Sequence, residues 1–129
     1  MKEQVKFFRC NICGNLVAVV NSSGVPMVCC DEEMEELQAN TVDASTEKHL
    51  PVVTKVSDGV WNVKIGSTPH PMVPEHFIDF LYFETTSGGK LVYLDHAGEP
   101  SAEVCLCDDK LVAVYAYCNL HGLWKTEIK

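Results

Sequence analysis

The sequence predicts a mainly β protein in two parts, a small cysteine-rich segment followed by an antiparallel β-sandwich. Seven short apolar runs separated by turn residues follow residue 40, closely spaced cysteines precede it, and no long helical pattern interrupts the apolar runs. The chain has 129 residues, of which 47% are hydrophobic. This length accommodates one ordinary core with a small module beside it.

The first part, residues 1–40, holds too little apolar material to form a core by itself. Two short β-type runs are expected, at residues 6–9 and 15–21. A Ser-Ser-Gly turn and residues 25–30 follow, and the acidic run 31–36 is expected to form a short solvated helix. A segment of this size needs a further cross-link, and a bound metal ion would provide one.

The second part, residues 41–129, has the pattern of a seven-stranded antiparallel sandwich. Turn residues such as Ser57–Gly59 and Ser87–Gly89 separate the runs, and inward and outward positions alternate along residues 77–82. The expected strands are residues 50–56, 59–65, 77–84, 89–95, 101–107, 111–118 and 123–128.

Composition excludes several classes of function. The net charge is −8 and there is no basic stripe, so we expect no nucleic-acid partner. The longest apolar run, residues 111–118, is too short to cross a bilayer, and the first ten residues lack the apolar region of a signal peptide. Seven cysteines, an odd number, fit a disulfide framework poorly. We therefore expect a cytoplasmic protein without a membrane partner, in which clustered cysteines bind metal.

Four cysteines form the first candidate metal group. Cys10 and Cys13 lie three residues apart and are followed by Gly14, which takes a positive φ without steric cost. Cys29 and Cys30 are adjacent, and strand neighbours face opposite sides, so this pair must lie in a turn to reach one metal. Four thiolates suit structural zinc or a single iron, and their spacing does not choose between the two.

A second group repeats the same knuckle with a histidine. Cys118 and His121 are again three apart and followed by Gly, although a buried Cys with an incidental His would give the same two residues. Three further histidines, His49, His70 and His76, lie beside prolines or at strand edges, where rigid loops hold ligands well. Four His and one Cys would form a five-coordinate site with an open position.

The remaining His and Cys residues receive simpler interpretations. His96 lies in a predicted turn and is expected at the surface. Cys105 and Cys107 alternate along an expected strand and are expected to be buried free thiols. A Cys and a His after a strand also occur in blue-copper loops, which carry an axial Met beyond the His, but no Met follows Met72. A cupredoxin-like copper protein is therefore the less favoured alternative.

Taken together, these motifs resemble the desulfoferrodoxin family, the two-iron form of superoxide reductase. The resemblance covers essentially the whole chain: Cys-x-x-Cys and Cys-Cys in front, then Glu-Lys-His-x-Pro, two His in a Pro-rich loop, and Cys-Asn-x-His-Gly. It implies a rubredoxin- or desulforedoxin-like iron domain at residues 1–40. It also implies an immunoglobulin-like sandwich at residues 41–129 that holds a catalytic iron.

The resemblance also implies a role for each site residue. Cys10, Cys13, Cys29 and Cys30 would hold the first iron. His49, His70, His76 and His121 would surround the second iron, with Cys118 axial. Lys48 would attract the anion, and Glu47 would take the open position after oxidation. The protein would be a cytoplasmic homodimer that reduces superoxide to hydrogen peroxide with electrons from rubredoxin or a similar donor.

Two other classes of function remain open from the sequence. A non-enzymatic electron carrier would need only the four-cysteine centre, which leaves four histidines unexplained. A binding sandwich with structural zinc would leave an open site unused. Without the resemblance, Glu47 and Lys48 would be assigned to a solvated charged loop.

Overall fold

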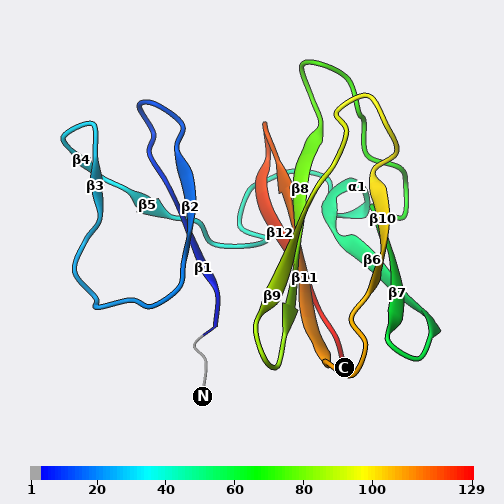
Figure 1. Cartoon of the computed structure of the whole chain (residues 1–129). Helices are drawn as coiled ribbons and strands as arrows, with labels where there is room; N and C mark the ends of the chain where they lie inside the picture. The colour runs from blue at the N-terminus through cyan, green and yellow to red at the C-terminus, as the bar shows by residue number, and fades with distance from the viewer. Residues whose placement is uncertain (1–3) are drawn as a thin grey trace. The chain divides into compact units, whose positions relative to one another are not determined.

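A computed structural model describes residues 4–129 of the chain, which divides into two compact units, Met1–Gln38 and Ala39–Lys129 (Figure 1). Every strand pair recorded in the described part is antiparallel. The mainly β fold class predicted from the sequence is confirmed.

The first unit is built from very short strands. Strand β1 (Lys6–Arg9) lies between β2 (Leu16–Val19) and β5 (Glu35–Glu36), while β3 (Val28–Cys29) pairs with β4 (Glu32–Glu33). Among its described residues, the buried apolar side chains are Phe7 and Cys10, each 2% exposed. So little burial contributes only a few kcal/mol, and the unit depends on a further cross-link, as its composition predicts.

The acidic run 31–36 is not the helix that we predicted. Cys30 and Asp31 both have positive φ, 54° and 61°, and they join β3 to β4 as a two-residue hairpin turn. The following residues pair instead with β1, with Glu35 opposite Arg9. The expected turn at the adjacent cysteines is confirmed, and that turn leads the chain into a hairpin instead of a helix.

The second unit is a sandwich of a three-stranded and a four-stranded sheet. The sheets have the orders β10-β7-β6 and β12-β11-β8-β9. Their strands are β6 (Pro51–Ser57), β7 (Val60–Ile65), β8 (Ile78–Thr85), β9 (Gly89–Tyr93), β10 (Ser101–Cys105), β11 (Leu111–Cys118) and β12 (Gly122–Glu127). The pairs β6–β7, β8–β9 and β11–β12 each form a hairpin within one sheet. The connections β7–β8, β9–β10 and β10–β11 cross from one sheet to the other, as in immunoglobulin-like folds.

The core of the sandwich lies between these sheets. Val63 and Ile65 of β7 face Leu81 and Phe83 of β8, and all four are fully buried. A single-turn helix, α1 (Thr46–His49), precedes β6. It is the helix recorded among residues 4–129, and none there is long and apolar enough to cross a membrane.

Strand register brings five strand ends together at one end of the sandwich. Pro51 at the start of β6 pairs with Ile65 at the end of β7. Cys118 at the end of β11 pairs with Ile78 at the start of β8 and with Gly122 at the start of β12. The α1 helix and the β7–β8 connection therefore meet the second knuckle at this end, which we call the ligand end.

The prediction that Cys105 and Cys107 are buried is wrong. Strand β10 ends at Cys105, and Cys107 has left the strand with a φ of 55°. Both thiols are exposed. Cys105 directly follows the buried Val104 in β10, so its side chain lies on the opposite, outer face of the strand, and Cys107 lies beyond the end of the strand.

Two candidate metal centres

The four N-terminal cysteines converge on one point. The Sγ atoms of Cys10, Cys13, Cys29 and Cys30 all lie within 4.8 Å of one another. Cys10 follows β1, Cys29 ends β3, and Cys30 lies in the hairpin turn after it. The backbone therefore brings together two cysteine pairs that are separated by 15 residues in the chain.

Backbone geometry orients the first knuckle. Gly14 has a φ of 85° and its N–H donates to the Cys10 carbonyl at 3.0 Å, which closes the turn. The Cys13 N–H donates to Cys10 Sγ at 3.4 Å. Asn15, to which sequence analysis gave no role, donates from Nδ2 to Cys29 Sγ at 3.7 Å.

These thiols have unequal affinities for protons. Hydrogen bonds from the backbone of Cys13 and Ile12 lower the pKa of Cys10 to about 6. Hydrogen bonds with neighbouring thiols, first with Cys13 and then with Cys10, raise the pKa of Cys30 to about 12. One cysteine ionises readily while others retain protons, so a metal would displace protons on binding. A tetrathiolate set of this kind fits tetrahedral iron or zinc.

The second group lies at the ligand end of the sandwich. Ligand-type atoms of His49, His70, His76 and Cys118 lie within 4.8 Å of one another. His121 adjoins them, with Nδ1 at 3.1 Å from His49 Nε2 and 3.9 Å from Cys118 Sγ. The structure thus brings together all five residues that the sequence assigned to this group, although His49 ends a helical turn instead of lying in a loop.

The four imidazoles form a closed circuit. Centroids of neighbouring rings are 4.8 Å apart for His49–His70, 4.6 Å for His70–His76, 5.1 Å for His76–His121 and 4.8 Å for His121–His49. Each neighbouring pair meets edge to face, at interplanar angles between 70° and 86°. The Cys118 thiol is fully buried beside this ring of four, which we call the histidine ring.

Hydrogen bonds decide which nitrogen of each histidine is free. His49 Nδ1 lies 2.6 Å from the Ser45 carbonyl, and His70 Nδ1 lies 2.7 Å from the Pro71 carbonyl. Each Nδ1–H therefore donates to a carbonyl, which leaves an acceptor lone pair on Nε2. Within the described residues, the buried Nε2 atoms of His70 and His76 have no hydrogen-bond partner. An orphaned buried nitrogen of this kind fits a metal ligand.

Burial favours the neutral form of three of these imidazoles, and metal binding requires that form. Burial is the largest cause that lowers the pKa of His49, of His76 and of His70, the last to about 4. Repulsion between neighbouring imidazoles adds to this effect, and Lys48 lowers the pKa of His49 and His76 further. Neutral imidazole is the form that binds metal, so the group is ready for a cation at neutral pH.

The second knuckle repeats the geometry of the first. Gly122 has a φ of 77°, and the His121 N–H donates to Cys118 Sγ at 3.4 Å. Burial raises the pKa of Cys118, and hydrogen bonds from the backbone of Leu120 and His121 oppose that rise. The sulfur is therefore held in an apolar setting with backbone donors directed at it.

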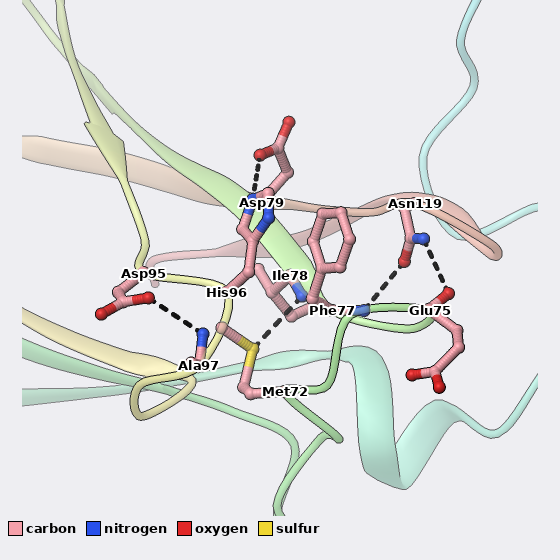
Figure 2. Close-up of polar contacts among 9 residues, drawn as sticks. All are labelled: Met72, Glu75, Phe77, Ile78, Asp79, Asp95, His96, Ala97 and Asn119. Carbon is pink, nitrogen blue, oxygen red and sulfur yellow. Dashed lines mark hydrogen bonds and ion pairs between the residues drawn. The ribbon is translucent and has the colours of Figure 1, made fainter.

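Asn119 ties the second knuckle to the loop that carries His76 (Figure 2). Its Oδ1 accepts from the Phe77 N–H at 2.8 Å, and its Nδ2 donates to the Glu75 carbonyl at 3.0 Å. Its own N–H donates to the Phe77 carbonyl at 3.2 Å. The side chain thus holds the backbone on both sides of His76, a contact that sequence analysis missed. The sequence feature that could have revealed this contact is the Asn that directly follows the first Cys in both knuckles.

Trp124 is a second residue that sequence analysis missed. Its ring stacks on His49 with centroids 4.8 Å apart and an interplanar angle of 19°. Its Nε1–H donates to the His121 carbonyl at 3.1 Å. One buried aromatic therefore fixes the orientation of two members of the histidine ring.

The two predicted catalytic residues lie on α1, beside His49. Glu47 and Lys48 are both exposed, as expected for residues that meet an incoming ligand. The Glu47 carbonyl accepts from the Thr68 N–H at 3.1 Å and from Ser67 Oγ at 3.3 Å. A Cβ at Gly66 would meet the Lys48 carbonyl at 2.7 Å, so a glycine there lets α1 pack against the β7–β8 connection.

His96 is exposed, as predicted, and lies outside the histidine ring. Its Nε2 is 2.7 Å from Asp79 Oδ1 and its ring stacks on Phe77 at a centroid distance of 3.6 Å (Figure 2). This contact packs the turn before β10 against the residue that follows His76. It has no ligand role.

Fold and donor sets together define a two-centre metalloprotein, with a tetrathiolate module and a buried site of four imidazoles and one thiol on an immunoglobulin-like sandwich. The family models described as desulfoferrodoxin and desulfoferrodoxin N-terminal domain match residues 41–127 and 2–37. The chain belongs to the desulfoferrodoxin family, and the resemblance noted in the sequence is confirmed.

Relatives and solved structures agree with this assignment. A desulfoferrodoxin from Syntrophotalea carbinolica is 42% identical over 129 residues and covers 98% of this chain and 99% of that protein. A superoxide reductase from Pyrococcus horikoshii is 35% identical over 67% of this chain and 90% of its own length. The crystal structure of the superoxide reductase from Treponema pallidum matches with a TM-score of 0.80 at 35% identity, over 97% of this chain and 100% of that chain.

Proposed function

We propose that this protein is a superoxide reductase, which converts superoxide, one electron and two protons into hydrogen peroxide. The observation that carries the proposal is the closed histidine ring beside the buried Cys118, with ring nitrogens left without partners. Relatives named superoxide reductase match the sandwich unit and the whole chain. Iron held at this site would supply the electron that superoxide takes up.

The donor set supports this cofactor at the catalytic centre. Neutral imidazoles together with a single thiolate suit iron. They do not suit magnesium or calcium, which prefer oxygen ligands. Copper is disfavoured because a blue-copper loop carries an axial Met beyond its His, and no Met follows His121 in the sequence. The last Met of the chain, Met72, already accepts a hydrogen bond at Sδ from the Ile78 N–H at 3.3 Å. The proposed ligands are His49, His70 and His76 through Nε2, His121 through Nδ1, and Cys118 through Sγ.

Cys118 would act as the electron-rich ligand, and the chain controls how strongly it does so. Backbone N–H groups of Leu120 and His121 share the charge of the sulfur. Such hydrogen bonds tune the electron donation of a metal-bound thiolate. The buried, apolar surroundings prevent water from doing the same.

Lys48 is proposed to attract the superoxide anion. Its charge already lowers the pKa of two members of the histidine ring, so its field reaches the site. The net charge of −8 does not prevent this, because exposed charges are largely screened beyond about 10 Å at moderate salt. Glu47, its neighbour on α1, is proposed to close the open face after oxidation.

The first centre is proposed to hold iron through Cys10, Cys13, Cys29 and Cys30 and to pass electrons. Rubredoxin or a similar carrier is the proposed donor, and a cytoplasmic homodimer is the proposed assembly. Donor, assembly and compartment follow from the family resemblance. A non-enzymatic carrier would need only the four thiolates, and it leaves the buried histidine ring without a role.

Reaction stoichiometry tests the proposal. With an electron donor present, the protein should form one peroxide per superoxide consumed, and turnover should stop when the donor is exhausted. A dismutase would form one peroxide from two superoxides and need no donor. Sustained donor-free turnover would therefore rule out the reductase. Metal analysis of protein purified without added metal should find two irons per chain.

A charge-matched pair of variants tests the role of Lys48. Lys48→Ile should slow the bimolecular reaction with superoxide by about tenfold and flatten its dependence on ionic strength, with iron content unchanged. Lys90→Ile removes the same charge from β9, opposite Phe83 and away from the ligand end, and should change neither. Equal rates in the two variants, measured by pulse radiolysis, would return Lys48 to a solvated surface role.

A further inference from the structure

Two exposed thiols remain that neither metal group uses. Cys105 ends β10, opposite Val60 at the start of β7, whereas the ligand end lies beyond Ile65 at the other end of that strand. Cys107 follows two residues later, and both thiols are exposed. The pair is therefore accessible to solvent and remote from the histidine ring.

Cys107 occupies a backbone position that usually belongs to glycine. Its φ is 55°, and the Asp109 N–H donates to the Leu106 carbonyl at 3.1 Å across the turn. The Leu106 N–H donates to the Gly59 carbonyl at 2.7 Å, and a Cβ at Gly59 would lie 2.5 Å from the Cys107 carbonyl. A side chain in this conformation is uncommon and costs on the order of 1 kcal/mol. The turn is therefore held firmly in a shape that turns Cys107 outward.

The two sulfurs are within reach of each other. Residues two apart in a strand have Cα atoms about 6.6 Å apart, which lies inside the range that disulfides span. The turn begins between the two cysteines, so the backbone that joins them is less than fully extended. A hydrogen bond with Cys105 is the largest cause that raises the pKa of Cys107, followed by the charge of Cys105. Cys105 is therefore the neighbour that most affects the Cys107 thiol.

Small oxidants have access to the pair. A cleft of about 270 Å³ opens beside Cys107, with Trp61 along its wall and Lys55 and Lys110 at its edges. Asp108 and Asp109 line the same cleft, so the charges of the two lysines are offset, and the cleft admits a small neutral oxidant. Hydrogen peroxide is far smaller than this cleft.

We propose that Cys105 and Cys107 form a redox dithiol that closes to a disulfide by reducing hydrogen peroxide. The source of that peroxide rests on the proposed function, because a superoxide reductase releases it as product. The dithiol itself needs only the oxidant. Its role is to remove peroxide at the surface of the protein that makes it, at the cost of one later reduction by a cellular thiol.

The reaction balances with the two cysteines alone. The Cys105 thiolate attacks one peroxide oxygen, the O–O bond breaks, and the leaving hydroxide takes a proton to form water. The Cys107 thiol then attacks the Cys105 sulfur of the resulting sulfenic acid, the S–O bond breaks, and a second water leaves. Two thiols lose two electrons and two protons, and one peroxide becomes two waters. Cys107 is assigned as the resolving thiol because its contact with Cys105 raises its pKa.

Peptide mapping of the intact two-iron protein tests the proposal. The protein is treated with added hydrogen peroxide, alkylated with iodoacetamide and digested with trypsin. Cleavage after the lysines at 90 and 110 releases residues 91–110, which contain Cys105 and Cys107 and no other cysteine. After peroxide this peptide should be two hydrogens lighter and unalkylated, and dithiothreitol should restore both alkylation sites. Full alkylation after peroxide, or oxygen addition without a disulfide, would overturn the proposal.

Single variants assign the two roles. In Cys107→Ser, Cys105 should stop at sulfenic acid, which dimedone traps. In Cys105→Ser, dimedone labelling of Cys107 should be at least several-fold weaker, and neither variant should form the internal disulfide. Equal labelling in the two variants would refute the assignment of Cys105 as nucleophile. Both variants should keep the wild-type rate of superoxide reduction, because neither thiol belongs to the catalytic site.

A final arm separates this proposal from the proposed function. Superoxide and an electron donor replace the added peroxide, with and without catalase. Disulfide formation that catalase suppresses supports both proposals. If added peroxide closes the disulfide but superoxide turnover does not, the redox dithiol is supported. The claim that the protein itself supplies the peroxide is then refuted.

Discussion

The two knuckles of this chain have the same backbone geometry in very different surroundings. In each, an N–H donates at 3.4 Å to a sulfur three residues back, and a glycine with positive φ follows, at 85° for Gly14 and 77° for Gly122. The first cysteine of each knuckle is buried, but Cys10 lies in a unit whose other buried apolar side chain among the described residues is Phe7, whereas Cys118 packs against the sandwich core. The knuckle sets the local ligand geometry, and the surroundings decide whether the site needs the metal in order to fold.

Removal of both metals should show the largest difference in stability between the two units. The first unit should unfold, because metal binding in small thiolate modules contributes on the order of 10 kcal/mol. The sandwich should stay folded on its own core. Hydrogen exchange should show lost protection in residues 4–38 and retained protection in β7, β8 and β11. Both tryptophans, Trp61 and Trp124, lie in the second unit, so the wavelength of their emission maximum should change little. Cooperative loss of both units would contradict this comparison.

Cys13→Ser tests, in the iron-loaded protein, whether the two metal centres are independent of each other. One of the two irons should be lost with the tetrathiolate spectrum, while superoxide reduction at the histidine ring largely survives. Cys105→Ser serves as a control, because it removes an exposed thiol that belongs to neither group. Iron content and pulse-radiolysis rates check both variants. Loss of the second iron in Cys13→Ser would mean that the centres depend on each other.

The buried histidines should make the metal-free sandwich sensitive to acid. Burial lowers the pKa of His70 to about 4 in the folded state, against 6.5 for an unperturbed histidine. Because the folded pKa is the lower one, the unfolded state binds protons first as pH falls. The contribution of neutral His70 to the free energy of unfolding is therefore complete above pH 6.5. It is lost as pH falls towards 4, by up to about 3 kcal/mol.

Denaturant unfolding of the metal-free protein, followed by tryptophan fluorescence between pH 7 and 4.5, measures this loss. His70→Gln should flatten the pH dependence, whereas His96→Gln, which changes an exposed histidine, should leave it as in wild type. An unchanged slope in His70→Gln would show that other groups govern the acid sensitivity.

The smallest expected effect concerns Asn119. Asn119→Ala should cost about 1–3 kcal/mol of unfolding free energy and shift the visible band of the oxidised site, because the backbone on both sides of His76 loses its hydrogen bonds. Iron affinity should fall with it. Asn119→Asp keeps the acceptor for Phe77 and should restore part of both properties.

Asn40 offers a matched control with the same number of hydrogen bonds. Its Oδ1 accepts from the Lys125 N–H at 2.9 Å, its Nδ2 donates to the Lys125 carbonyl at 3.1 Å, and its N–H bonds the Leu123 carbonyl at 3.0 Å. Asn40→Gly suits its φ of 64° and should cost similar stability without shifting the band. Equal spectral shifts in the two variants would make Asn119 a general structural residue.

Much of the fold could be predicted because strands and turns carry local signals. Strands β1 and β11 have the predicted bounds, and the other sandwich strands lie within two residues of theirs. The two errors arose where the decisive contact is not local. Residues 31–36 have a composition that suits a solvated helix, yet Glu35 pairs with Arg9, some 26 residues earlier. The exposure of Cys105 depends on which face of β10 packs against the core, and that face carries Val104.

By itself, the sequence determined which residues are available as ligands, because residue type, the spacing of three and the following glycine are properties of a short segment. Only the tertiary structure decided how His49, His70, His76 and His121 follow one another around a ring, and that Nδ1 of His49 and of His70 is taken up by a backbone carbonyl. The physical reason is that α1, the β7–β8 connection and the end of β11 are distant in the chain and meet only through strand register. The hydrogen bonds of Asn119 and the stacking of Trp124 arise in the same way.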